Sequence, residues 1–325
     1  MTKAVILGTG SCLPERGLTN VELEQMVDTS DEWITTRTGI KQRRISGPGE
    51  FNYKLAAQAG LRALDMAGLK PTDLDFIVVA TLSPQKIMPS TACFVQNEIG
   101  AVNAFAYDIN AACTGFTYGI DLASKYIQFH PNMKVLVIGS ETLSTRVNWQ
   151  DRNTCVLFGD GAGAAVLGAC EDGRGVIGSK LRSDGRLWDL LHMDGPESQN
   201  KDLQPEGWEG ALIKMNGGEI FKHAVRAMQD VVVDLLGEHD VATEEIDLLI
   251  PHQANIRILK QLQSRLKLPD EKVFVNVHKY GNTSAASIPI ALDEANRQGL
   301  IKKNDMVVFC TFGAGLTWAS LLTRW

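Results

Sequence analysis

The sequence predicts an α/β protein made of two similar halves, and two observations lead to this prediction. Short β-branched runs alternate with segments of helical spacing along the whole chain, which is typical of βα units with buried sheet strands. The order of the runs also repeats. Asp75 and Asp247 open similar runs 172 positions apart, and the run at 135–138 returns 171 positions later. Such a repeat indicates a duplicated structural unit.

The same patterns place the elements in order. Strands are expected at residues 4–7, 75–80, 134–138, 246–250 and 305–309. Cys113 and Asn282, 169 positions apart, each precede a segment with apolar residues at helical spacing. These apolar residues are Phe116, Ile120, Ala123 and Ile127 after the cysteine, and Ile288, Ala291 and Ala295 after the asparagine. Duplication would bring both strand-to-helix junctions to one central face. The polar segment from Arg182 to Gly218 has no clear period and is expected to be a long excursion or a lid.

Composition narrows the class of protein. A chain of 325 residues with 44% apolar and 22% charged residues is typical of a soluble α/β unit or two packed domains. A net charge of −6 argues against a general nucleic-acid binder. No apolar run has membrane-spanning length, and residues 1–7 lack the features of a signal peptide. The six cysteines form no CxxC pair, so we expect reduced thiols, no metal site and a cytoplasmic location.

Three residues in separate stretches are candidates for catalysis. Cys113 offers a thiol at a helix start, where the dipole and free amides stabilise a thiolate. His252 follows a strand, at the edge of the sheet where ligands usually bind. Asn282 offers a hydrogen-bond donor that never becomes charged. Taken singly, each has a structural alternative: a small buried residue, a helix cap and a turn residue. His278 competes with His252 for the role of the histidine.

The order Cys, His, Asn also fits a papain-like protease, with spacings of 139 and 30 residues. The local sequence argues against it, because the C-G-[SA]-C-[WY] motif around the nucleophile is absent. The nearly 110 residues before the thiol would have no role in that class.

The assembled motifs resemble those of the 3-oxoacyl-acyl-carrier-protein synthase III family of the thiolase superfamily. The resemblance runs from GTGSCLP at residues 8–14 to GLTWA at 315–319, and includes DEWITTRTGI at 31–40, LFGDGAG at 157–163 and HKYGNTSAAS at 278–287. It implies a thiolase-like five-layered α-β-α-β-α fold from two duplicated halves. We place these halves at residues 1–170, with the nucleophilic cysteine, and 171–325, with the histidine and asparagine.

The resemblance implies a decarboxylating Claisen condensation without a cofactor. Cys113 would take an acyl group from acyl-coenzyme A, and malonyl-acyl-carrier protein would lose carbon dioxide to give an enolate that attacks the thioester. His252 and Asn282 would hydrogen-bond the malonyl thioester oxygen. The backbone amides of Cys113 and Ala314 would form the oxyanion hole. These roles agree with the chemistry of the residues, since each donor meets charge that appears in the transition state.

Further residues are assigned by the resemblance alone. The coenzyme A contacts would be Thr29, Trp33, Arg37, Arg152 and Asn255, with Arg152 pairing with Trp33 across the adenine. The basic patch for the acidic carrier protein would include Lys222 and Arg257. Met88 and Phe312 would belong to the acyl pocket. The family's practice implies a homodimer in which Met88 reaches the neighbouring subunit's pocket.

Three related interpretations stay open. A degradative thiolase needs a second catalytic cysteine, and Cys310 stands one position away from the required C-x-G pattern. A relative could condense acyl-coenzyme A with another acceptor, in quinolone or polyketide biosynthesis. An inactive subunit that shapes a partner synthase is the third, and the retained thiol, imidazole and amide argue against it.

Overall fold

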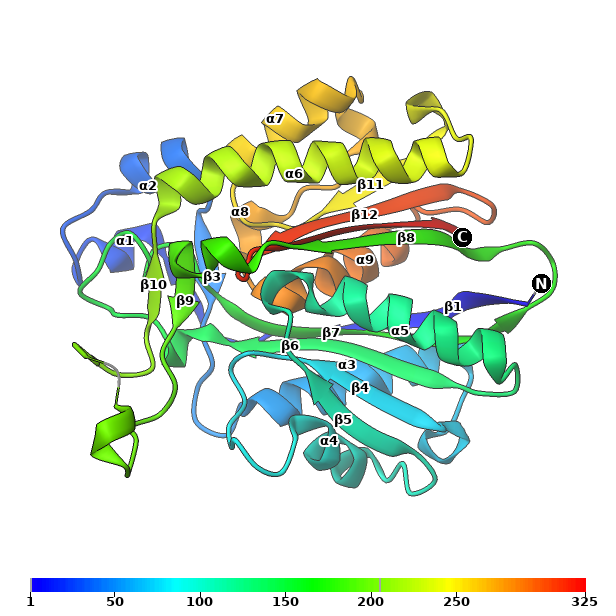
Figure 1. The fold of residues 1–325 in the computed structure, drawn as a ribbon, viewed down its shortest axis with the longest axis horizontal. Helices are drawn as coiled ribbons and strands as arrows, with labels where there is room; N and C mark the ends of the chain where they lie inside the picture. The colour runs from blue at the N-terminus through cyan, green and yellow to red at the C-terminus, as the bar shows by residue number, and fades with distance from the viewer. Residues whose placement is uncertain (1, 205) are drawn as a thin grey trace.

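The computed structural model describes residues 2–204 and 206–325, and two β-sheets lie at its centre (Figure 1). The first sheet has the order β1-β7-β6-β4-β5, with β1 (Lys3–Cys12), β4 (Phe76–Ala80), β5 (Phe105–Ile109), β6 (Val135–Thr142) and β7 (Asp160–Cys170). The second has the order β11-β12-β13-β8, with β8 (Gly175–Ser183), β11 (Leu248–Pro251), β12 (Met306–Gly313) and β13 (Thr317–Arg324). The predicted strands are therefore confirmed.

The two sheets share one topology, which confirms the predicted duplication. In the first, β4 and β6 are parallel, while β7 runs antiparallel to both β6 and β1. In the second, β11 and β12 are parallel, and β13 runs antiparallel to both β12 and β8. The sequences of the central parallel strands are continuous apolar runs because helices cover both faces of these strands.

Helices form three layers around the two sheets (Figure 1). The middle layer contains α5 (Gly115–Phe129) and α9 (Ser287–Arg297), the two helices predicted after Cys113 and Asn282. The first sheet is covered on its outer face by α3 (Asn52–Ala67) and α4 (Thr91–Ile99), and the second by α6 (Gly217–Glu238) and α7 (Ile256–Leu266). The arrangement is the five-layered α-β-α-β-α fold that the resemblance implied.

The middle layer is the most deeply buried part of the molecule. Phe116 and Ile120 of α5 and Ile288 and Ala291 of α9 belong to one apolar cluster that also takes side chains from both sheets. Burying a large apolar side chain stabilises a fold by roughly 1.5–3 kcal/mol, so this layer holds the two halves together. It also fixes the helix starts that carry the candidate site.

Shorter elements surround one end of the sheets. They are β2 (Gly17–Thr19), α1 (Asn20–Leu23), α2 (Asp31–Thr38), β3 (Gln42–Arg44), β9 (Leu191–Met193), β10 (Ile213–Met215) and α8 (Val277–Tyr280). The expected excursion at 182–218 contains the β9–β10 pair. The boundary between halves at residues 170 and 171 stays a prediction; it falls between β7 and β8. In the described ranges no helix is long and apolar enough to cross a membrane.

Candidate active site

Two equivalent turns build the centre of the site. In the first half, η2 (Ala112–Thr114) leads into α5, and in the second, η8 (Ser284–Ala286) leads into α9. Ala112 and Ser284 stand 172 positions apart and share a left-handed backbone, with φ of 46° and 47°. Non-glycine residues in this region store strain of about 1–3 kcal/mol and cluster at functional sites. The structural equivalent of Asn282 is therefore Asn110, two residues before this turn.

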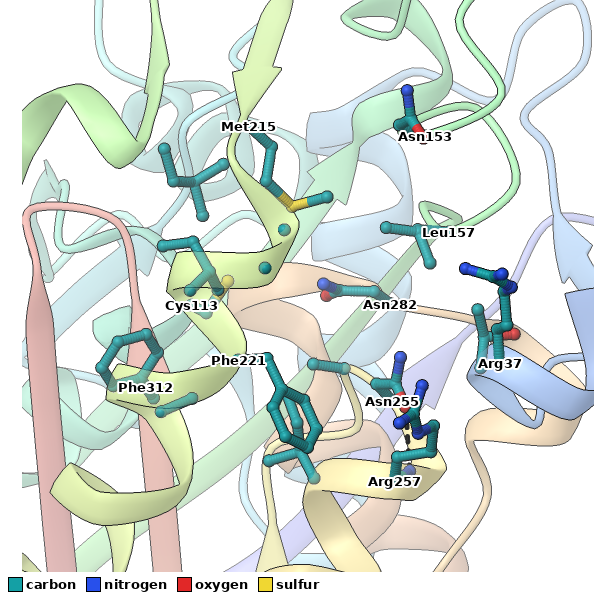
Figure 2. A pocket seen from close by; sticks show the side chains of 18 of the residues that line it. Arg37, Cys113, Asn153, Leu157, Met215, Phe221, Asn255, Arg257, Asn282 and Phe312 are labelled. Carbon is teal, nitrogen blue, oxygen red and sulfur yellow. Dashed lines mark hydrogen bonds between the residues drawn. The ribbon is translucent and has the colours of Figure 1, made fainter.

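Cys113, His252 and Asn282 line one cavity of about 810 Å³. Figure 2 shows Cys113 and Phe312 at one end of this cavity and Arg37 and Asn153 at the other, with Asn282 between them. Pockets of this size suit an extended small molecule. The cavity thus has a thiol end and a mouth, which fits a substrate that enters as a long arm.

Cys113 is a buried, protonated thiol in the free protein. Burial raises its pKa to about 12, and the charge of Glu141 acts in the same direction. The Ser284 hydroxyl and the amide of Cys113 itself act against this shift. A thiol in this state needs a group that takes its proton when it attacks a carbonyl.

His252 is neutral, and its tautomer is set by its surroundings. It follows β11, and its Nδ1 lies 2.8 Å from Ser287 Oγ. That hydroxyl accepts a hydrogen bond from the Gln253 amide at 2.8 Å, and among the described residues Nδ1 is the one acceptor within reach of its own hydrogen, so we assign that hydrogen to Nδ1. The ring proton then sits on Nε2, on the side away from Ser287. Burial lowers the pKa of His252 to about 4, and the imidazole therefore acts as a neutral donor.

Asn282 is held by its backbone on both sides. Its amide donates to the Leu157 carbonyl at 2.8 Å, and its carbonyl accepts from Gly159 at 3.0 Å. The Ser284 amide donates to Asn282 Oδ1 at 2.9 Å. Among the described residues Nδ2 has no hydrogen-bond partner, and Asn282 lines the cavity, so Nδ2 can donate into it.

The C-terminal glycine-rich turn packs directly on the nucleophile. A Cβ on Gly313 would lie 2.8 Å from the Cys113 nitrogen, so only glycine allows this approach. The Thr317 hydroxyl donates to the Ala314 carbonyl at 2.9 Å and lies 3.0 Å from the Thr114 hydroxyl. These contacts tie the Ala314 turn to the Cys113 turn, as an oxyanion hole made of both amides requires.

An indole and two guanidinium groups stack near the mouth. The Arg37 guanidinium lies 4.8 Å from the centre of the Trp33 ring, and that of Arg152 lies 5.2 Å from it. Arg152 also donates to the Asp28 carbonyl at 2.9 Å. Trp33 and Arg37 line the cavity; Arg152 does not line it but contacts Trp33, which does. The pairing of Arg152 with Trp33 across an adenine stays a prediction.

The other residues proposed for binding are spread around the same mouth. Asn255 caps α7, where it accepts from the Arg257 amide at 2.8 Å, and both residues line the cavity. Lys222 lines it as well, and its ammonium pairs with Glu219 at 2.7 Å. Thr29 does not line the cavity, and its hydroxyl is buried without a partner in the described chain.

A second cavity of about 150 Å³ also borders Cys113. Its lining contains Leu82, Cys113, Leu143, Phe158, Leu191, His192, Met193, Ile213, Ser284 and Ala314, with Asn110 and Ala112. Phe312 lines the larger cavity instead, because β12 carries it past the thiol. Met88 lies in neither; it is 83% exposed on the loop after β4.

The competing residues lie elsewhere. His278 lines neither cavity. Cys310 is buried against α6, where its sulfur contacts the Met228 carbonyl at 3.4 Å, and burial raises its pKa. It cannot serve as the second cysteine of a thiolase from that position. Among the described residues, no group of three or more His, Cys, Asp or Glu side chains is arranged to hold a metal ion.

Fold and cavity together define a condensing-enzyme scaffold of the thiolase-like class. A family model described as 3-oxoacyl-[acyl-carrier-protein] synthase III matches residues 107–185, and the model of its C-terminal part matches 236–325. The chain is 59% identical, over 99% of both chains, to beta-ketoacyl-[acyl-carrier-protein] synthase III of Desulfotalea psychrophila. This chain belongs to the 3-oxoacyl-[acyl-carrier-protein] synthase III family.

Solved structures agree with this assignment. The crystal structure of 3-oxoacyl-[acyl-carrier-protein] synthase III from Aquifex aeolicus superposes with a TM-score of 0.92, at 50% identity and with 100% of both chains covered. The priming beta-ketosynthase of the R1128 polyketide pathway superposes with a TM-score of 0.90, at 33% identity, covering 99% of this chain and 96% of that one. The same scaffold therefore serves in a polyketide pathway, although the relatives of higher identity carry the synthase III name.

Proposed function

We propose that this protein condenses an acyl-coenzyme A primer with malonyl-acyl-carrier protein to give 3-oxoacyl-carrier protein, coenzyme A and carbon dioxide, the step that initiates fatty acid synthesis. The observation that carries the proposal is the cavity in which a buried thiol faces two neutral donors. Family membership supports the choice of substrates. No resident cofactor is required, because both substrates bring activated thioesters.

The geometry supports a two-stage mechanism. In the first stage Cys113 attacks the acyl-coenzyme A carbonyl, and the amides of Cys113 and Ala314 stabilise the oxyanion. In the second, the malonyl thioester oxygen meets His252 Nε2 and Asn282 Nδ2, whose hydrogen bonds strengthen as decarboxylation turns it into an enolate oxygen. Removing one donor of this kind typically costs about 10²–10³ in kcat. Neutral donors stabilise the enolate without protonating the carbon that must attack.

The mouth of the cavity supports binding of a nucleotide-bearing thioester. Trp33 offers a stacking surface for adenine, while Arg37 and Arg152 offer planar cations for phosphates. Arg257, which lies over the Phe221 ring at 5.6 Å, and Lys222 provide positive charge for an acidic carrier protein. An Arg257→Ala variant should raise the KM for the carrier protein and weaken its salt dependence, whereas Lys260→Ala on the same helix should change little.

Assembly as a homodimer in the cytoplasm belongs to this proposal. β5 is an edge strand of the first sheet, and Phe105 on it, with Ile87 and Met88 on the nearby loop, is exposed. A second copy that covers these residues would bring Met88 to the partner's smaller cavity. Light scattering should give twice the mass of the 325-residue chain, and Met88→Asp should shift it towards the monomer.

Intact-mass spectrometry tests the reaction itself. The protein is mixed with a panel of acyl-coenzyme A substrates and then with malonyl-acyl-carrier protein, beside Cys113→Ala. We expect an acyl adduct that is missing from the variant and is discharged as 3-oxoacyl-carrier protein. An adduct that malonyl-carrier protein does not discharge would favour the relative that uses another acceptor. Absence of any adduct would contradict the covalent mechanism.

A further inference from the structure

The buried carboxyl of Glu141 has no function in the mechanism above, yet it lies beside the nucleophile. It stands near the end of β6 and has no exposed surface. Its carboxylate oxygens accept from the Leu82 amide at 3.2 Å, the Thr81 hydroxyl at 3.3 Å and the Ser83 hydroxyl. All of these donors are neutral. A buried carboxyl without a cation is costly as an anion and is best placed to exchange a proton.

Charged groups nearby are directed elsewhere. Arg146, after β6, donates to the Pro84 carbonyl at 3.4 Å. Asp160, on β7, accepts from Ser144 at 2.6 Å. From the middle layer, Ser284 of η8 acts on Glu141, and the charge of Glu141 acts on Cys113 of η2. In the described chain no Lys, Arg or His side chain pairs with Glu141. Its one titratable neighbour of consequence is therefore the thiol.

Ser284 is a neighbour of both groups: it lines the smaller cavity with Cys113 and with Leu82, whose amide donates to Glu141. Its hydroxyl is close enough to lower the pKa of both Cys113 and Glu141, but it makes no hydrogen bond of normal geometry within the described residues. It is 1% exposed and lines the smaller cavity beside Cys113. A buried hydroxyl without a partner is costly to the fold, and this one is free to take a proton from the thiol and pass its own to the carboxylate.

His252 cannot fill this role. In the tautomer assigned above, Nδ1 accepts from Ser287 and Nε2 already carries the ring proton. Asn282 does not titrate. We propose that Glu141, acting through Ser284, takes the Cys113 proton when the thiol is acylated and returns it when the acyl group leaves. The inference rests on the proposed function, and it assigns a proton acceptor that the three candidate residues do not provide.

The proton balance closes over the two stages. In the first, the S–H bond of Cys113 breaks, its proton reaches Glu141 through Ser284, and the sulfur forms a bond to the acyl carbon; the departing coenzyme A thiolate takes a proton from water. In the second, the enolate attacks, the C–S bond breaks with its electrons on sulfur, and Glu141 returns the proton. Only one negative charge is held by the Cys113–Glu141 pair before and after the transfer, so the site never contains two buried anions.

The pH dependence of thiol alkylation by iodoacetamide, read by intact mass, tests the pair without any substrate. When two groups share one negative charge, the alkylation rate rises with pH until the pair has lost its first proton. The rate then stays level until the pair begins to lose its second proton. We expect the native rate to rise through the Glu141 pKa of about 7 and then to level off. The alkylation rate of Glu141→Gln should instead rise about tenfold per pH unit with no plateau. The Glu141→Asp variant should show the plateau again.

Acylation by acyl-coenzyme A in a single turnover at pH 7 is the second readout. Glu141→Gln and Ser284→Ala should each acylate about 10²-fold more slowly, the lower range for proton-transfer catalysis. Alanine is compatible with the left-handed backbone of Ser284, because Ala112 adopts it in the other half. Ser140→Ala is the matched control: it removes a buried hydroxyl on the same strand that donates to the Asn52 carbonyl at 3.1 Å, and it should keep acylation within a few-fold of native.

The outcomes separate the two proposals. If both variants acylate at the native rate and the native alkylation profile has no plateau, Glu141 is not the acceptor, while the proposed function stands. If the native protein takes no acyl group from any acyl-coenzyme A, the proposed function fails, but the alkylation profile still decides whether Cys113 and Glu141 share a proton. Should Glu141→Gln not fold, the acylation rate of Ser284→Ala and the native alkylation profile together decide whether Glu141 accepts the proton.

Discussion

Ser287 Oγ lies 2.8 Å from Nδ1 of His252, and this contact decides which nitrogen of the imidazole faces the substrate. The Gln253 amide occupies a lone pair of the same hydroxyl, which leaves the hydroxyl hydrogen for Nδ1. Both side chains are buried, so water does not compete for the bond. Ser287 therefore acts as a positioning residue that keeps a proton on Nε2.

Ser287→Ala should separate the two stages of the reaction. Without the hydroxyl, Nδ1 can carry the proton and Nε2 loses its donor, so condensation should slow by about 10–10². Acylation of Cys113 should stay within about twofold of native, because His252 takes no part in it. Single-turnover mass spectrometry measures both steps, and ¹⁵N NMR of the imidazole reports the tautomer.

Ser124→Ala is the matched control for this variant. Ser124 is equally buried, on α5, and its hydroxyl donates to the Asp121 carbonyl at 2.7 Å. It should leave both steps at the native rate. Equal losses of acylation and condensation in Ser287→Ala, with an unchanged ¹⁵N spectrum, would contradict the positioning role.

His252 and Glu141 should have opposite effects on stability in weak acid. The folded pKa of His252 is about 4, below its usual 6.5, so the unfolded chain binds the extra proton and stability is lost as pH falls from 6.5 towards 4. The folded pKa of Glu141 is about 7, above its usual 4.5, so the folded chain binds the proton and stability is gained as pH falls from 7 to 4.5. Each effect amounts to about 3 kcal/mol over its full range.

Urea unfolding at pH 7.5 and pH 5 shows this compensation. When the pH is lowered from 7.5 to 5, the native protein loses unfolding free energy because of His252. The His252→Asn variant lacks this loss, so its stability should increase relative to that of the native protein. Glu141→Gln should lose stability relative to native for the opposite reason. The other titrating groups are common to the three proteins and cancel in the comparison. Parallel changes in all three would show that neither group has the shifted pKa given above.

Trp33 should contribute to the binding of acyl-coenzyme A and not to the chemistry. Base stacking on an aromatic side chain is worth about 1–3 kcal/mol, so Trp33→Ala should raise the KM for acyl-coenzyme A by about 5–150-fold. The rate at which pre-acylated protein reacts with malonyl-carrier protein should not change. Trp188→Ala, at an exposed tryptophan outside both cavities, is the control and should leave this KM unchanged.

If adenine binds between Trp33 and Arg152 as proposed, Arg152 limits how it enters this site. Stacking a base between Trp33 and Arg152 needs two van der Waals layers, about 7 Å, while the guanidinium lies 5.2 Å from the ring centre. The arginine must therefore swing away from Asp28 when the nucleotide binds. The sequence suggested the pair of residues, and the structure adds that the free protein holds them in contact.

The sequence patterns succeeded where they report periodicity and failed where function depends on packing. The buried runs of β4 and β6 and the stripe of α5 are strong local signals, and they led directly to the duplicated fold. Ser287 and Glu141 have no such signal, since one of the two serines at 284–287 and one acidic residue near the end of a strand look ordinary. The resemblance placed Phe312 in the acyl pocket without telling which cavity that is; the structure puts this side chain in the lining of the larger one, and its contact with an acyl chain stays a prediction.

The smaller cavity should set the length of the acyl primer. An apolar cavity of about 150 Å³ holds a molecule the size of benzene, so primers of up to about six carbons should acylate Cys113 and longer ones should react poorly. Ile213, buried on β10, forms part of its wall. Ile213→Ala should shift the preferred primer towards longer chains by two or three carbons, read from kcat/KM across an acyl-coenzyme A series. Ile220→Ala, in the wall of the larger cavity, should leave the preferred length unchanged, and a shift caused equally by both variants would mean that the acyl chain does not occupy the smaller cavity.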